Sequence, residues 1–129
     1  MDRKQQELVG KICIGLIVIL ISIVLITKRF VYFRPNSTMF AVDESYKVIK
    51  QAHLHGLLSD ESNLDKVVLI CNSNQGNMSH ASEIMKNMHA LGYRVCTFDY
   101  SGFGKSWGIP SEQQLYDDAS YMVALLRQT

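Results

Sequence analysis

The hydrophobic pattern of this chain begins with an uninterrupted apolar run close to the N-terminus. Residues 12–26 are apolar apart from one glycine and one serine, and they carry no charge. As a helix this run spans roughly 24 Å, and the wider stretch 8–27 approaches the roughly 20 residues needed to cross a bilayer. Lys11 and Lys28 stand at its two ends, where their ammonium groups can reach lipid headgroups. We therefore predict a single-pass membrane anchor over residues 1–29.

Two other interpretations of the run fit less well. A cleaved signal peptide should end in small residues, whereas this run ends in Leu25–Arg29. A buried core helix should be apolar along one stripe only, and this run is apolar on all sides. The positive-inside rule does not choose an orientation, because three basic residues lie on each side of the run. Arg34–Ser37 then reads as a short linker.

The following pattern predicts two short strands and then a more apolar one. Tyr46–Lys50 alternates apolar and polar residues, as a half-buried strand does. His53–Leu58 is a second strand candidate, and the polar segment Ser59–Asn63 is typical of a turn. We expect the two strands to pair as an antiparallel hairpin. Val67–Cys71 is apolar on both faces, which indicates a central strand covered on both sides.

Helical periodicity appears twice in the second half of the chain. A helix is predicted from about Ser79 to Leu91, and Gly92 ends it as a C-terminal glycine should. The strand Tyr93–Phe98 follows, and it should run parallel to the strand before the helix. A last helix is predicted over Ser111–Arg127. Its start carries a capping-box pattern, with Ser111 three residues before Gln114. The expected buried stripes are Ala81, Ile84, Met85 and Met88 in the first helix, and Leu115, Ala119, Met122, Val123 and Leu126 in the second.

Composition narrows the function classes. A chain of 129 residues with a membrane segment holds at most one soluble domain. Its net charge of +1, without a basic patch, argues against a nucleic-acid partner. Three cysteines do not form a disulfide framework, and we expect Cys71 and Cys96 to be buried thiols.

Several segments together resemble a known enzyme family. They are Leu54–Leu58, the loop Asn74–Asn77, the turn Asp99–Ser106 and the helix start Pro110–Glu112. In this order they are similar to the front half of a membrane-anchored α/β-hydrolase, the fold of abhydrolase-domain lipases, esterases and serine peptidases. The resemblance implies an α/β fold in which an antiparallel hairpin precedes a β-α-β-α unit, with residues 30–129 as a partial hydrolase domain.

The same resemblance implies which loop would take part in catalysis. In this family the loop after the third strand supplies one backbone N–H of the oxyanion hole, and Asn74, Gln75 and Gly76 occupy that loop here. The loop usually begins His-Gly, whereas this chain has Asn72-Ser73. The family's nucleophile, acid and histidine follow the last helix predicted here. We therefore expect the N-terminal portion of a serine hydrolase, not catalytic alone.

One motif in the turn invites a different interpretation. Gly104–Gly108 matches Gly-x-Ser-x-Gly, with Ser106 in the nucleophile position. A nucleophile elbow needs a strand running directly into the motif, but here the strand ends near Asp99. All four histidines also precede the serine, the reverse of the family order. We interpret Ser106 as a turn residue and the motif as a decoy.

Other polar residues are expected to have structural roles. His53 and His55 lack an evident third ligand, so we predict no metal and no cofactor. We expect Asp99 to accept hydrogen bonds from turn amides, and Asp117 and Asp118 to form a solvated helix face.

Three functions remain open from the sequence. The first is the non-catalytic, membrane-anchored portion of a serine hydrolase. The second is a membrane-tethered binding module derived from a hydrolase fold, with a protein partner or a second copy at an exposed sheet edge. The third, ranked last, is a small hydrolase using Ser106.

Overall fold

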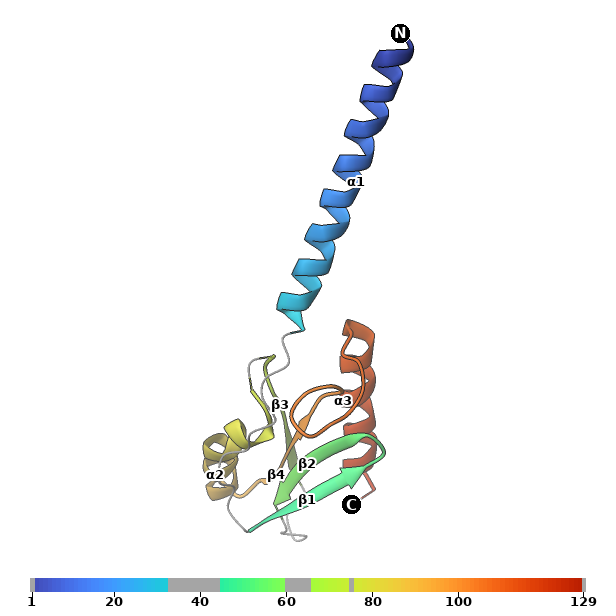
Figure 1. Ribbon diagram of the computed structural model, residues 1–129. Helices are drawn as coiled ribbons and strands as arrows, with labels where there is room; N and C mark the ends of the chain where they lie inside the picture. Colours follow the sequence, from blue (N-terminus) through green and yellow to red (C-terminus); the bar gives the residue numbers. More distant parts are fainter. Residues whose placement is uncertain (1, 33–44, 60–65, 75, 129) are drawn as a thin grey trace. The chain divides into compact units, whose positions relative to one another are not determined.

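The computed structural model describes residues 2–32, 45–59, 66–74 and 76–128 (Figure 1). The chain divides into two compact units, Met1–Phe33 and Arg34–Thr129. The predicted linker at residues 34–37, most of the predicted turn at 59–63, and Gln75 lie outside the described residues.

The first unit contains helix α1, Arg3–Val31. Asp2 caps its start, because the carboxylate accepts a hydrogen bond from the Gln5 amide at 2.8 Å. Within α1, the segment Arg3–Lys28 is the one described helix that is long and apolar enough to cross a membrane. Length and composition therefore agree with the predicted anchor.

The second unit is built on a four-stranded mixed sheet in the order β1-β2-β4-β3. Its strands are β1 (Tyr46–Gln51), β2 (Leu54–Ser59), β3 (Val67–Cys71) and β4 (Arg94–Asp99). The pairs β1–β2 and β2–β4 are antiparallel, whereas β3 and β4 are parallel. These pairings confirm the predicted hairpin and the predicted β-α-β unit.

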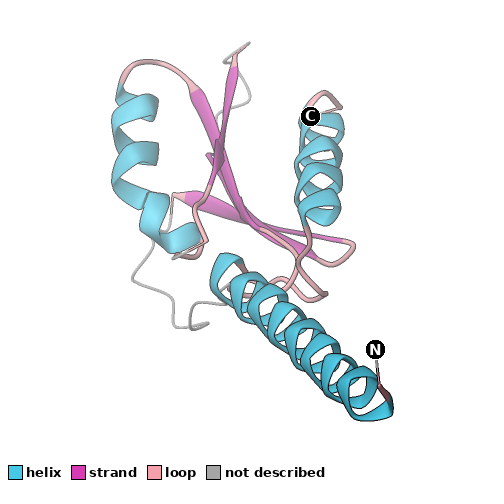
Figure 2. Ribbon diagram, turned by 90° about the horizontal axis from the view of Figure 1, so that it is seen from above, coloured by secondary structure: helices cyan, strands magenta, loops and turns pink. Residues whose placement is uncertain are grey.

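Helices cover the two opposite faces of this sheet (Figure 2). The 3-10 helix η1 (Met78–Ala81) and helix α2 (Ser82–Ala90) pack on one face, and helix α3 (Glu112–Leu126) packs on the other. Alternation along β4 divides its side chains between two cores, because Val95 faces α2 while Cys96 and Phe98 face α3. Burying a side chain such as Phe98 stabilises the fold by about 1.5–3 kcal/mol.

The two predicted helices are present with small changes. The first begins as η1 before it becomes α2, and Gly92 follows it with a φ of 84°, as expected of a C-terminal glycine. Of its predicted stripe, Ala81 and Met85 are buried, but Ile84 is 50% exposed. The serine at position 111 caps α3 and accepts a hydrogen bond from the Gln114 amide at 3.1 Å.

The prediction that Val67–Cys71 is a central, fully covered strand is wrong for the described part of the chain. Strand β3 lies at one end of the strand order, and its residues are half-buried, with Cys71 exposed. Its doubly apolar pattern correctly predicted a strand but not how far it is buried. The fully buried residues of both cores come from β4, the hairpin and the helices, and β3 adds only the partly buried Val67, Leu69 and Ile70. Of the two thiols expected to be buried, only Cys96 is.

Candidate functional site

Two connections meet where the parallel strands β3 and β4 end: the loop Asn72–Asn77 after β3, and the turn Tyr100–Pro110 after β4. Asp99 joins them, and its side chain is buried. One carboxylate oxygen accepts a hydrogen bond from the Met78 amide at 2.6 Å, and the other accepts one from the Lys105 amide at 3.0 Å. Burial raises the pKa of Asp99, and these two amides partly oppose that effect. The predicted turn-binding role of Asp99 is confirmed.

Gly104 is required for this arrangement. Its backbone has a φ of 47°, and a Cβ added there would overlap the Asp99 carboxylate. Any other residue at position 104 would therefore displace the carboxylate as well as strain the backbone. The glycine in the turn thus follows from the close approach of the backbone to Asp99.

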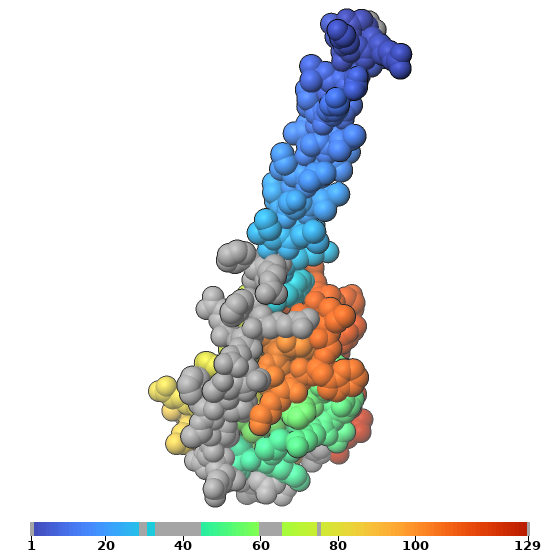
Figure 3. All heavy atoms as spheres, in the orientation of Figure 1, coloured from blue at the N-terminus to red at the C-terminus, as the bar shows by residue number. Residues whose placement is uncertain are grey.

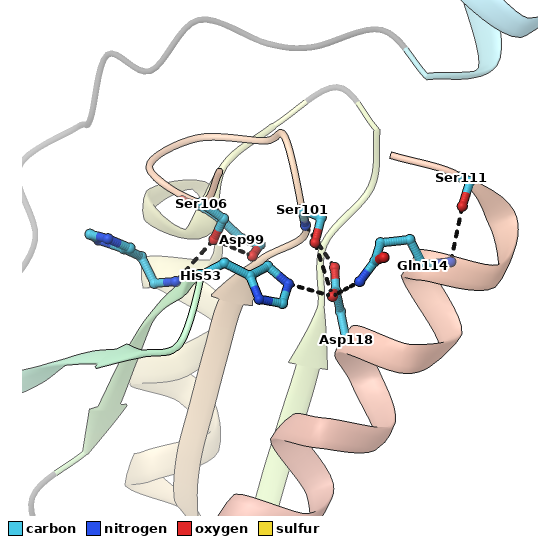
Figure 4. Close-up of polar contacts among 8 residues, drawn as sticks. His53, Asp99, Ser101, Ser106, Ser111, Gln114 and Asp118 are labelled. Carbon is cyan, nitrogen blue, oxygen red and sulfur yellow. Dashed lines mark hydrogen bonds and ion pairs between the residues drawn. The ribbon is translucent and has the colours of Figure 1, made fainter. Parts of the chain in front are cut away.

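Ser106 lies inside the same turn, and its hydroxyl makes two hydrogen bonds. The Oγ donates to the Asp99 carbonyl oxygen at 2.6 Å and accepts from the His55 amide at 2.9 Å (Figure 4). The side chain is 6% exposed. These contacts attach the turn to the end of β4 and to β2.

Asp118 organises a second group of contacts, between α3 and the rest of the unit. From α3 it points toward Ser101 and His53 (Figure 4). Its carboxylate accepts bonds from the Ser101 amide at 2.7 Å, the Ser101 hydroxyl at 3.0 Å and the Gln114 side chain at 2.8 Å. The His53 Nε2 atom lies 3.1 Å from the same carboxylate. Burial alone would raise the pKa of Asp118, but these hydrogen bonds outweigh it and lower the pKa.

The prediction that Asp118 is solvated is wrong, since its relative exposure is 2%. Asp117, its neighbour, is exposed and accepts a hydrogen bond from Gln113. A signal for burial was available in the sequence, because Leu115, Asp118 and Met122 share the helical spacing of the inner stripe. A polar residue on that stripe requires buried partners, and Ser101 and His53 supply them.

The contacts of Asp118 do not form a catalytic triad. In a Ser-His-Asp triad the histidine stands between the hydroxyl and the carboxylate, so that it can take the serine proton. Here the carboxylate of Asp118 stands between Ser101 and His53. The arrangement joins the turn, the hairpin and α3, and it places no histidine next to the Ser101 hydroxyl to act as its base.

The loop after β3 is fixed at its two ends. At the start, the Asn72 side-chain amide donates to Thr97 Oγ1 and to the Phe98 carbonyl oxygen, both at 2.9 Å. At the end, the Asn77 backbone amide donates to Nδ1 of His80 at 3.1 Å, so that the histidine side chain takes part in capping η1.

Of the three oxyanion candidates, Asn74 is exposed and Gly76 is buried, while Gln75 lies outside the described residues. A Cβ added at Gly76 would lie 3.1 Å from Cγ of His80, so the backbone passes close to that ring. The role of these three residues stays a prediction. No group of three or more His, Cys, Asp or Glu residues suited to a metal occurs within the described ranges.

Comparison with known proteins gives partial similarity to abhydrolases. The chain is 38% identical over 64 residues to the lysophosphatidylserine lipase ABHD12 of Danio rerio, covering 48% of this chain and 17% of that protein. It is 41% identical over 58 residues to ABHD12 of Gallus gallus, covering 43% of this chain and 15% of that protein. It is also 48% identical over 52 residues to the uncharacterized protein Rv2307c of Mycobacterium tuberculosis, covering 40% of this chain and 18% of that protein.

No family model and no solved structure matches the chain. The matched stretch spans less than a fifth of the length of these relatives. Similarity to an abhydrolase is therefore confirmed over about half of this chain. Separately, the chain has one described helix that is long and apolar enough to cross a membrane.

Proposed function

We propose that this chain is the membrane-anchored N-terminal portion of a serine hydrolase of the α/β-hydrolase type. The observation that carries the proposal is that Asp99, at the carboxyl end of the parallel strands, binds the Met78 amide after one connecting loop and the Lys105 amide in the other. Ligands bind at that edge in open α/β sheets. Partial similarity to ABHD12 supports the hydrolase class.

The chain's contribution to the reaction is electrostatic. A serine hydrolase forms a tetrahedral intermediate whose oxyanion needs preorganised N–H donors. A backbone amide of Asn74, Gln75 or Gly76 would supply one donor from the loop after β3. The hydrogen bonds of Asn72 and Asn77 at the two ends of this loop support the role, because an oxyanion-hole donor must be held in place before charge develops on the substrate. The substrate would be an acyl ester of a lipid, the class named for ABHD12.

The serines of the turn do not act as nucleophiles in this proposal. Ser106 directs its proton to the Asp99 carbonyl oxygen, and Ser101 directs its proton to the Asp118 carboxylate. A carbonyl oxygen is not a general base, and the Asp118 carboxylate is held at a lowered pKa by its other partners. These two serines are therefore expected to be unreactive, and we expect the chain alone to be inactive.

A fluorophosphonate probe tests the absence of a nucleophile directly. The full chain in mild detergent should not be labelled, and it should not hydrolyse short acyl esters above the buffer rate. Ser106→Ala and Ser111→Ala serve as a matched pair, because Ser111 is an exposed helix cap of the same residue type. Labelling or turnover that Ser106→Ala abolishes and Ser111→Ala preserves would overturn the proposal.

A second candidate is a membrane-tethered binding module that uses the edge of β3. The observation that favours it is the half-exposure of an apolar, β-branched strand at the end of the strand order. Such an edge presents backbone groups for pairing with another chain. We propose a partner polypeptide or a second copy that adds a strand beside β3.

Light scattering of the purified chain in mild detergent distinguishes this candidate. Self-association that Val68→Lys removes, and that Val48→Lys on β1 leaves intact, would support pairing at β3. Val48 is the control because it is an exposed valine on another strand of the sheet, whereas Val68 is half-buried. A monodisperse monomer would remove the second copy as a partner.

A further inference from the structure

The turn after β4 presents two large apolar side chains to solvent. Trp107 is 69% exposed and Ile109 is 80% exposed, although Phe103 and Pro110 of the same turn are buried. Lys105 is also exposed. We call the three exposed residues, Lys105, Trp107 and Ile109, the ridge. Figure 3 shows the turn and the start of α3, in orange, at the surface of the second unit.

The backbone beneath the ridge is held in place. The Ser106 amide donates to the Phe103 carbonyl oxygen at 2.9 Å, and the Trp107 amide donates to the His53 carbonyl oxygen at 3.2 Å. The Trp107 indole meets the His53 ring edge-on, with the ring centroids 5.7 Å apart. Gly108 has a φ of 130°, which only glycine adopts readily. The ridge is therefore preformed, and binding through it requires little loss of conformational entropy.

We propose that the ridge inserts into the interfacial layer of the lipid bilayer, and this inference rests on the proposed membrane anchor. Tryptophan favours that layer, because its ring is apolar while its N–H remains hydrated. Isoleucine at position 109 adds apolar area beside it, and the Lys105 ammonium complements lipid phosphates. A few inserted side chains bind a membrane only marginally, so a second attachment is needed.

The chain itself provides that second attachment. The twelve residues from 33 to 44 join α1 to the described part of the second unit, and fully extended they span at most about 40 Å. With α1 in the bilayer, the ridge stays within reach of the membrane surface at high effective concentration. Docking through the ridge would turn the carboxyl end of β4 toward the lipid, from which an amphiphilic acyl ester would enter.

Trp107 reports on this directly, because it is the only tryptophan in the chain. The full chain is reconstituted into vesicles of anionic phospholipid with and without bromine on the upper acyl chain. We expect the brominated lipid to quench Trp107 and the bilayer to protect it from acrylamide. Ile109→Ser and Lys105→Ser should each reduce the bromine quenching by roughly twofold. Ile84→Ser is the matched control, since Ile84 is an exposed apolar residue on α2.

The outcomes separate the ridge from the anchor. Flotation of the chain with the vesicles measures membrane attachment through α1, which contains no tryptophan and so does not contribute to the quenching. Failure to float overturns both the anchor and the docking. Flotation without bromine quenching leaves the anchor intact and overturns the ridge. A third outcome is that Trp107 is protected from acrylamide but not quenched by bromine, and that this protection disappears when the protein is diluted in lipid. It would mean that a second copy of the chain covers the ridge, and it would also overturn the proposal. Equal losses in Ile109→Ser and Ile84→Ser would overturn it as well.

Discussion

Strands β3 and β4 run parallel and side by side, yet their surroundings differ sharply. Strand β4 is almost wholly buried, and the turn after it uses Asp99, Ser101 and Ser106 in internal hydrogen bonds. Strand β3 is half-exposed, and the loop after it exposes Asn74. The motif-rich turn is thus held by its own buried hydrogen bonds, whereas the loop after β3 keeps an exposed residue. A recognisable sequence motif can therefore mark a structural element of the fold.

The largest expected effect comes from Gly104→Ala in the turn after β4. The new Cβ would overlap the Asp99 carboxylate and occupy a left-handed backbone conformation. We expect a loss of about 3 kcal/mol or more in the free energy of unfolding. Gly92→Ala is the control, because Gly92 has a φ of 84° but open space around its Cα, so only about 1 kcal/mol should be lost. Urea unfolding of the full chain in mild detergent, followed by circular dichroism, measures both. Equal losses would mean that the contact with Asp99 contributes nothing.

Removing the Asp118 carboxylate should have the next largest effect. In Asp118→Ala the buried amide and hydroxyl of Ser101 lose their acceptor, and His53 loses its partner. We expect a loss of about 2–4 kcal/mol. Asp117→Ala, one position along and exposed, should change stability by less than about 0.5 kcal/mol. The same unfolding assay compares the two variants. Small and similar losses of stability in both would mean that Asp118 has the solvated role first expected.

The sequence predicted the strands, the helices and the parallel pairing of β3 with β4, because each depends on local periodicity and turn residues. It did not predict how far β3 is buried, since burial depends on how the helices pack across the strands of the sheet. It also placed Asp118 in solvent, because adjacent acidic residues usually share an exposed face, and only its spacing from Leu115 and Met122 indicated otherwise. The role of Asp99 was predictable, since a strand-ending acid before a glycine turn has few other partners.

The two buried aspartates should respond to acid in opposite directions. The folded pKa of Asp118 lies below its ordinary value of 3.8. Asp118 therefore stabilises the fold above that pH, and its contribution is lost as the pH falls through the folded pKa. The folded pKa of Asp99 lies above 3.8, so its ionised form costs stability, and this cost is relieved as the pH falls through the raised pKa.

This difference in sign can be measured with one substitution at each site. Relative to the natural chain, Asp118→Asn should flatten the loss of Tm on acidification, and Asp99→Asn should steepen it. Melting curves between about pH 6 and pH 3 cover the range in which carboxyl groups titrate. Parallel curves for the two variants would show that the two sites carry no opposite proton linkage.

The smallest effect, on thiol reactivity, compares the two strands most directly. Burial raises the pKa of Cys96 on β4 to about 12, whereas the Cys71 thiol on β3 is exposed. Only a thiolate reacts with maleimide, so at pH 8 Cys71 should be labelled in the folded chain and Cys96 only after unfolding. Cys13→Ser removes the thiol of α1 from the assay. If Cys71 becomes protected from maleimide as the chain self-associates, while the labelling of Cys96 does not change, a partner strand lies at the β3 edge. Labelling of Cys71 that does not depend on concentration would count against a second copy there.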